Sequence, residues 1–216
     1  MPSRWPRISL LIPVAAGVLV MSACDDDDPV APPTTETATS TLVSLNGETA
    51  TGTVTFSLTV DEFIARVELE GADPDMPHAQ HVHASAACPT AAADTNSDGF
   101  IDVLEGMPSY GGILVPLDGD VSSQAAGSAT FPSADANGDY IYADTVSFTA
   151  FMTDLLATDP DPNDAIVKLT TNSLNIEART VVVLGVADTT TLPATVATLS
   201  GLTPQQSLPI ACGTVD

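Results

Sequence analysis

Alternating apolar and polar residues constrain the fold of this chain more than any other feature. Between residues 53 and 60, valine, phenylalanine and leucine occupy every second position, with threonine and serine between them. Successive side chains of a β-strand point to opposite faces, so this pattern predicts a strand with one buried face. A second alternating run covers residues 63–69, where the polar positions hold Arg66 and Glu68. The domain is therefore expected to be built from strands.

Turn-forming residues separate these runs at short intervals. Asn46-Gly47 suits a type I′ hairpin turn, which would pair the segment from Thr41 with the strand that follows. Only residues 149–158 favour a short helix, because their apolar side chains have a helical spacing. Many short strands with frequent turns indicate an all-β antiparallel sandwich or barrel. The further predicted strands are residues 81–85, 113–117, 125–131, 141–148, 179–186 and 206–212.

The twelve residues from Asp94 to Glu105 match the calcium-loop pattern of EF-hands. Ca²⁺ is held by several hard oxygen ligands, and this spacing places an oxygen donor at each ligand position of the pattern. Gly99 lies at the sharp turn of the loop, and Ile101 is the apolar residue expected to anchor it. An acidic, solvated turn is the alternative interpretation. The predicted calcium ligands are Asp94, Asn96, Asp98, the Phe100 carbonyl, Asp102 and Glu105.

Proline and glycine flank this loop on both sides, at Pro89, Gly106 and Pro108. Because both residue types disfavour long helices, the usual pair of flanking helices is not expected. We interpret the loop as an insertion, at about residues 88–112, in a β scaffold. A calcium sensor needs the flanking helices for its opening motion, so the ion is expected to have a structural role.

Residues 1–23 have the organisation of a secretory signal peptide. Two arginines precede an apolar run from Ile8 to Met21, which is shorter than the ~20 residues of a transmembrane helix. The segment Val20-Met-Ser-Ala-Cys24 resembles the bacterial lipobox, in which the cysteine is diacylated and becomes the mature N-terminus. We therefore expect a lipid-anchored protein of the bacterial cell envelope, either periplasmic or at the cell surface. The alternative is that Cys24 is an ordinary thiol.

Residues 24–40 are rich in aspartate, proline and threonine and have almost nothing to bury, which predicts a disordered tether. Residues 41–216 are expected to form one domain. After removal of the signal peptide, three basic residues remain against 28 acidic ones, a formal net charge of −25. This charge excludes nucleic acid as a natural partner but is compatible either with cation binding or with simple solubility.

The chain has three cysteines, Cys24, Cys88 and Cys212. If Cys24 carries lipid, the other two remain as a pair in an oxidising compartment, and a disulfide between them is predicted. Closing a loop of this length would stabilise the fold by about 4–5 kcal/mol in the chain-entropy model. Two separate buried thiols are the alternative.

All three histidines lie within a short segment, at His78, His81 and His83. On a strand, His81 and His83 point to the same face, where one Cu²⁺ or Zn²⁺ ion could bind both imidazoles. His78 has the opposite parity and could join them only if the chain bends after Pro77. The alternative is that these histidines are hydrogen-bonded to carboxylates or backbone and bind no metal.

Several short motifs resemble the copper/zinc superoxide dismutases. They are His81-Val-His83 followed by Cys88, the valine-rich segment that begins at Arg179, and Ile210-Ala-Cys212-Gly. The chain also resembles the CHRD-type domains of secreted proteins and bacterial lipoproteins. The resemblance implies a Greek-key antiparallel β-sandwich, with His81 and His83 as copper ligands and Cys88 and Cys212 as an intrasubunit disulfide.

Two departures from the dismutase pattern argue against its activity. Leu184 occupies the place of a further copper-binding histidine, and no histidine follows His83 to build a zinc site. We therefore expect a non-catalytic, calcium-binding β-sandwich of the CHRD type, anchored to the membrane through Cys24. One alternative is a copper-binding or relic dismutase-like protein that uses the histidine cluster. Another is an adhesion module that presents the calcium loop, with an apolar patch at residues 107–113, to a protein partner.

Overall fold

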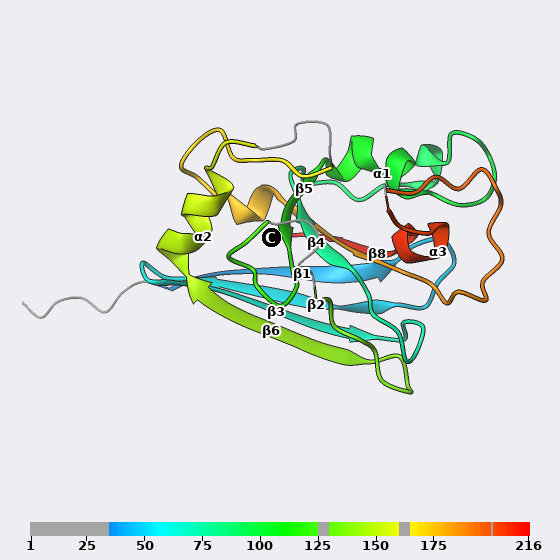
Figure 1. Cartoon of the computed structure of the whole chain (residues 1–216), viewed down its shortest axis with the longest axis horizontal. Coiled ribbons are helices and arrows are strands. Elements are labelled where there is room, and N and C mark those ends of the chain that lie inside the picture. Colours follow the sequence, from blue (N-terminus) through cyan, green and yellow to red (C-terminus); the bar gives the residue numbers. More distant parts are fainter. Residues whose placement is uncertain (1–34, 125–129, 160–164, 200) are drawn as a thin grey trace, which may run out of the picture. The chain divides into compact units, whose positions relative to one another are not determined.

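The structure is a computed structural model that describes residues 35–124, 130–159, 165–199 and 201–216. Within these residues, eight strands form one sheet in the order β5-β4-β7-β8-β1-β2-β3-β6, and every neighbouring pair is antiparallel (Figure 1). The strands are β1 (Glu36–Ser44), β2 (Thr51–Leu58), β3 (Glu62–Glu70), β4 (Gln80–His83), β5 (Ile113–Pro116), β6 (Tyr140–Ser147), β7 (Thr180–Leu184) and β8 (Pro209–Thr214).

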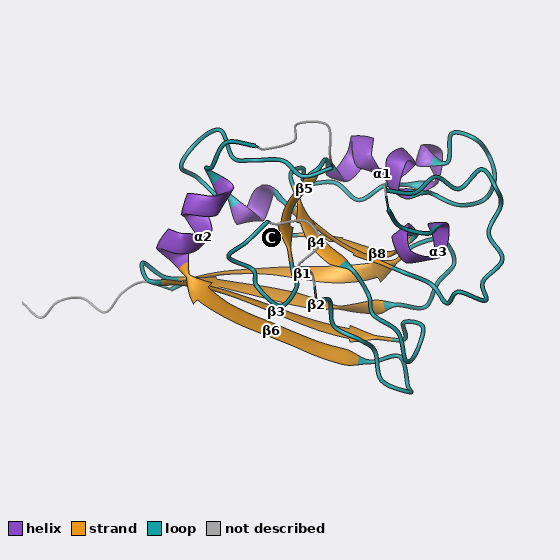
Figure 2. Ribbon diagram, viewed as in Figure 1, coloured by secondary structure: helices purple, strands orange, loops and turns teal. Residues whose placement is uncertain are grey.

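The sheet curls into two halves that face each other across one core. β1, β2, β3 and β6 form one half, and β4, β5, β7 and β8 form the other (Figure 2). The halves join where Val43 and Ser44, at the end of β1, pair with β8. The chain leaves β3 for β4 in the other half, and β6 then returns to lie beside β3, which is a Greek-key connection. The predicted all-β Greek-key antiparallel sandwich is confirmed.

The alternating pattern of β2 and β3 fixes which side chains enter this core. Phe56 pairs with Ala65 and Val54 with Val67, and all four side chains are buried. Phe63 stacks on Phe151 with ring centroids 4.3 Å apart. Burying one such ring stabilises the fold by about 1.5–3 kcal/mol relative to leaving it exposed. A one-residue slip in register would exchange this face for the polar one, so the pattern specifies the pairing.

Short helices and turns connect the strands. The predicted helix near residues 149–158 is confirmed as α2, which Ser147 caps. Among the described residues, no helix has both the length and the apolar character needed to cross a membrane. The α-helices are α1 (Val103–Tyr110), α2 (Phe148–Leu155) and α3 (Pro204–Ser207), and the 3-10 helices are η1 (Ala91–Ala93) and η2 (Ile176–Ala178).

Three boundaries predicted from the sequence are wrong. β1 begins at Glu36, inside the predicted tether, because Ala38 and Ser40 are buried when this segment pairs with β2. Residues 206–212 are not one strand, since Gln206 and Ser207 belong to α3, which starts with a capping box at Thr203, and β8 begins only at Pro209. Residues 130–131 are not in a strand, and the rest of the strand predicted at 125–131 lies outside the described residues.

The hairpin turn and the disulfide follow the predictions. Asn46 and Gly47 both have positive φ, at 55° and 77°, as a type I′ turn requires. Cys88 and Cys212 form the predicted disulfide, with an S–S distance of 2.02 Å, and it ties the inserted segment to β8. The predicted signal peptide and the lipidated Cys24 lie outside the described residues.

Candidate functional site

The backbone of the Asp94–Glu105 loop turns where the calcium pattern requires it. Gly99 has a φ of 93°, a conformation that favours a residue without a Cβ. The carboxylate of Asp94 accepts hydrogen bonds from the amides of Asp98, at 3.1 Å, and Gly99, at 3.0 Å. Asn96 Oδ1 also accepts from the Asp98 amide, at 2.9 Å. The side chains at loop positions 1 and 3 therefore meet at the same turn.

Glu105 closes the loop from its C-terminal end. Its Oε1 accepts hydrogen bonds from the amide and the hydroxyl of Thr95, at 2.9 and 2.8 Å, and from the Asn96 amide, at 3.2 Å. Partial burial acts to raise the pKa of this carboxyl, but the hydrogen bonds from Thr95, Asp102 and Asn96 outweigh it and hold the pKa below its usual value. Position 12 of the pattern thus lies over positions 2 and 3.

Asp102 begins a helix that the sequence analysis did not expect. Its Oδ1 accepts from the amides of Leu104 and Glu105, at 2.9 and 3.0 Å, and its Oδ2 accepts from the amide of Ala197, at 2.7 Å. This cap and the burial of Val103 stabilise α1 even though Pro108 lies inside it. One short helix of eight residues therefore follows the loop, where no long helix was expected, whereas η1 on the other side is one short 3-10 turn.

The loop is fixed to the rest of the domain by polar side chains from distant segments. Asn46, in the β1–β2 turn, bonds both backbone groups of Ile101, with its Oδ1 accepting at 2.7 Å and its Nδ2 donating at 3.0 Å. Thr195 Oγ1 donates to Asp98 Oδ2 at 2.6 Å. Ile101 itself is buried, as predicted for the anchoring residue.

The donor set of the loop fits calcium in its chemistry. All the predicted ligands are hard oxygens, which Ca²⁺ prefers, and the loop folds back on itself as a calcium loop does. The carboxylates now accept hydrogen bonds from amides, and within the described residues no three His, Cys, Asp or Glu side chains are grouped as a metal site. Asp102 is held by three amides and is 2% exposed, so it serves the helix and the loop closure rather than an ion directly.

His81 and His83 lie together on the outer face of β4. Val82, between them, points into the core, so both imidazoles face away from it. Their ring centroids are 5.9 Å apart, and they are covered by Tyr110, 4.5 Å from His83, and Phe131, 5.3 Å from His81. His83 Nδ1 bonds the Gly111 carbonyl at 2.8 Å. In the described part of the chain, His81 Nδ1 and His83 Nε2 are buried without a hydrogen-bond partner.

Burial keeps both imidazoles of this pair neutral. Burial, and secondly the charge of His83, lower the pKa of His81 to about 3. Burial lowers the pKa of His83 to about 4, although the carbonyls of Gly111 and Gly112 act to raise it. A neutral imidazole nitrogen is the form that binds a metal ion.

His78 does not join the histidine pair. Its Nε2 lies 2.9 Å from the Asp73 carbonyl, and its Nδ1 lies 3.3 Å from the Leu184 carbonyl. Each nitrogen therefore lies beside a backbone carbonyl, to which the protonated nitrogen donates, and the ring packs 6.2 Å from Tyr140. Of the three histidines, the structure brings together only the two of equal strand parity.

The apolar patch expected at residues 107–113 is absent from the surface. Tyr110 and Ile113 are buried, and Met107 packs against the small cluster of Tyr110, Val182, Leu184 and Cys212. This cluster fills the space between α1 and the outer face of β7 and β8. Because the apolar side chains are used inside the fold, the adhesion module has no support here.

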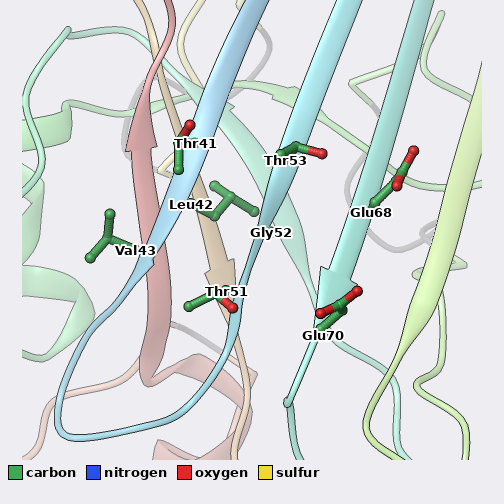
Figure 3. Close-up of a pocket in the computed structure, with 8 residues that line it drawn as sticks. All are labelled: Thr41, Leu42, Val43, Thr51, Gly52, Thr53, Glu68 and Glu70. Atoms are coloured by element: carbon green, nitrogen blue, oxygen red, sulfur yellow. The ribbon is translucent and has the colours of Figure 1, made fainter.

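A shallow depression of about 460 Å³ lies on the first half of the sandwich, and Figure 3 shows that its side chains do not converge on one point. Gly52 lies in the depression, and a Cβ at this residue would collide with the Glu68 carbonyl. Glu68 is already paired with Arg66 at 2.8 Å. We assign the depression no role in the site. It is lined by Thr41, Leu42, Val43, Thr51, Gly52, Thr53, Glu68 and Glu70.

Among solved structures, the chain is similar to the crystal structure of a double mutant of a SOD-like protein from Bacillus subtilis. It is 17% identical in sequence, the match covers 82% of this chain and 95% of that chain, and the TM-score is 0.42. At this identity and TM-score, the likeness supports no conclusion about the site. No protein-family model and no curated protein matches the chain.

Proposed function

We propose that this protein is a non-catalytic, CHRD-like β-sandwich whose Asp94–Glu105 loop binds one structural Ca²⁺ ion. The observation that carries the proposal is the closure of the loop by Glu105, which meets Thr95 and Asn96 at the opposite end. In a twelve-residue calcium loop, the glutamate at the last position is a bidentate ligand and must therefore return to the start of the loop. Asp94, Asn96, Asp98, the Phe100 carbonyl and Glu105 would hold the ion, and Asp102 would position Glu105 through the helix cap.

The physical role of the ion would be to offset charge repulsion within the loop. Asp94 accepts a hydrogen bond from the Asp98 amide and Glu105 accepts one from the Asn96 amide, so one short loop carries several carboxylates, and the mature chain carries a large excess of acid. A bound divalent cation compensates these charges and gains several oxygen ligands. The loop would then hold Cys88, α1 and the segment around Thr195 in one arrangement.

Anchoring to a membrane is the second part of the proposal. The signal-like residues 1–23 and the lipobox-like segment that ends at Cys24 support it. The protein would then sit on the periplasmic or outer surface of a bacterial envelope. Mass spectrometry of the mature N-terminus, in the parent and in Cys24→Ala, tests this part, and an unmodified Cys24 in the parent would overturn it.

Calorimetry of the purified protein with and without Ca²⁺ tests the calcium site. We expect Ca²⁺ to raise the melting temperature of the parent, because a ligand that binds only the folded state stabilises it by mass action. Asp94→Ala and Glu105→Ala should remove this rise. Asp75→Ala, at an exposed residue outside the loop, should keep it.

The control condition is an equal ionic strength of Mg²⁺. Because the chain is strongly acidic, any divalent salt screens repulsion and raises stability to some degree. A melting temperature that rises equally with Mg²⁺ and Ca²⁺ and is unaffected by Glu105→Ala would contradict a specific site.

A second candidate function is binding of Cu²⁺ or Zn²⁺ by His81 and His83. The observation that favours it is the pair of buried ring nitrogens without partners, Nδ1 of His81 and Nε2 of His83. A buried polar atom with no partner is costly, and a shared metal ion would satisfy both. Two ligands leave positions open, so we propose binding and not dismutase activity.

Elemental analysis of the protein after exposure to copper or zinc tests this candidate. We expect about one equivalent of metal in the parent, a loss in His81→Ala, and retention in Asp94→Ala, which lies outside the pair. A parent that returns from dialysis free of both metals would eliminate the candidate.

A further inference from the structure

Asn46 holds the closing half of the calcium loop through three hydrogen bonds. Its Oδ1 accepts from the Ile101 amide at 2.7 Å, and its Nδ2 donates to the carbonyls of Ile101, at 3.0 Å, and Pro209, at 2.9 Å. A single carboxamide therefore satisfies both backbone groups of Ile101, as a neighbouring strand would. The same group ties them to the first residue of β8.

The β1–β2 turn presents this side chain in a fixed position. Asn46 has a φ of 55° and Gly47 one of 77°, and the Glu48 amide closes the turn on the Leu45 carbonyl at 2.9 Å. Asparagine tolerates this left-handed conformation better than most residues with a side chain. The turn and its carboxamide thus act as one rigid support, because both adjoining strands are paired in the sheet.

The Asn46 side chain can influence a bound ion through Ile101, because Ile101 lies next to residues of the proposed site. It lies between Phe100, whose carbonyl is a proposed ligand, and Asp102, which caps α1 and positions Glu105. Its side chain is 7% exposed, so it is fixed on its apolar side as well. Holding its backbone therefore places the oxygens on both sides of it.

We propose that Asn46 is the positioning residue of the calcium site, and that it sets the affinity of the loop by ordering Phe100, Asp102 and Glu105 before the ion binds. This inference rests on the proposed calcium function. A site that is ordered in advance loses less conformational entropy on binding, so its affinity is higher. Without Asn46, ion binding would have to order Phe100, Asp102 and Glu105 as well as the residues at the start of the loop.

Calcium titration of the full chain, purified in detergent, tests the proposal. Asn46→Gly removes all three hydrogen bonds but keeps a residue that accepts positive φ. We expect it to weaken Ca²⁺ binding about ten-fold, within the usual range of coupling between sites. Asn175→Gly is the matched control, since Asn175 is exposed and also has a positive φ, of 46°. It should leave the calcium affinity unchanged.

A second variant and a second measurement keep the outcome clear. Asn46→Asp keeps the acceptor for the Ile101 amide but sets a carboxylate oxygen against the carbonyls of Ile101 and Pro209, so its affinity should also fall below that of the parent. Exchange of the Ile101 amide proton in calcium-free buffer should be at least about ten-fold faster in Asn46→Gly than in the parent, because its only acceptor among the described residues is removed.

The outcomes separate this proposal from the one it rests on. Unchanged calcium affinity in both Asn46 variants, with the parent binding normally, would overturn the positioning role and leave the calcium site standing. A parent that fails to bind Ca²⁺ would overturn both. In that case, the amide exchange of Ile101 shows whether Asn46 still orders this segment for stability alone.

Discussion

Single residues on the outer face of β4 couple the stability of the fold to pH. His81 and His83 have pKa values of about 3 and about 4 in the folded protein, against 6.5 for a free imidazole. Between pH 6.5 and pH 4, the unfolded chain therefore binds protons that the folded chain does not. The free energy of unfolding must fall as the pH falls through this window. Above pH 6.5 both states are neutral at these residues, and the effect vanishes.

We expect the free energy of unfolding to drop by about 2–4 kcal/mol between pH 7 and pH 5, as measured by urea denaturation. His81→Leu should make this pH dependence shallower by about half, because one of the two imidazoles no longer titrates. Carboxyls with a lowered pKa, such as Asp98 and Asp135, lose their contribution only at lower pH, near and below 4. A flat profile from pH 7 to pH 5 would rule out two neutral buried imidazoles.

The sequence predicts this pair of histidines only in part. Strand parity correctly places His81 and His83 on one face and separates His78. Parity does not reveal that Tyr110 and Phe131 cover the pair, since these residues come from segments far along the chain. Burial, and with it the lowered pKa, depends on those distant contacts.

At the scale of one element, α1 shows how a cap can outweigh a proline. Pro108 lacks an amide for the hydrogen bond to the previous turn, which argues against a long helix here. Asp102 and Glu105 form a capping box at its start, and Tyr110 donates from its hydroxyl to the Val103 carbonyl at 2.8 Å. The capping pattern was visible in the sequence, but it coincided with calcium-loop positions 9 and 12 and was interpreted as ligands.

We expect Asp102→Ala to lower the free energy of unfolding by about 2 kcal/mol in calcium-free buffer, because three amides lose their acceptor. Ser147→Ala is the matched control at the start of α2. That cap is exposed and its hydrogen bond is long, 3.5 Å, so its loss should cost less than about 0.5 kcal/mol. Equal effects of the two substitutions in urea denaturation would contradict a special role for Asp102.

At the scale of the whole molecule, the disulfide joins segments 124 residues apart. Reduction, or the double substitution Cys88→Ala with Cys212→Ala, should lower the free energy of unfolding by about 4–5 kcal/mol, since the unfolded chain regains the entropy of a long loop. Calorimetry on oxidised and reduced protein measures this directly. Identical melting temperatures in the two states would show that the bond adds nothing to the fold.

The alternating pattern predicts many of the strands in both halves of the sheet. It does not predict how the two halves join. The alternation of the neighbouring sequence is enough to predict that Val54 and Phe56 are buried, because side chains on a strand repeat every two residues. The pairing of Val43 with Cys212 involves residues at opposite ends of the domain, and nothing local specifies it. The start of β1 at Glu36 was missed for the same reason, since its polar residues become strand only beside β2.

This pairing of β1 with β8 also bears on how the protein is made. β1 leaves the ribosome well before β8, although one edge of β1 pairs with β8 and with Asp216, whose amide and carbonyl both bond Thr39. Until synthesis reaches β8, the β1–β3 meander has an open edge, and an open edge invites pairing with other chains. Pairing between segments this far apart in the sequence is slow to form, so we expect the two halves of the sheet to join late in folding.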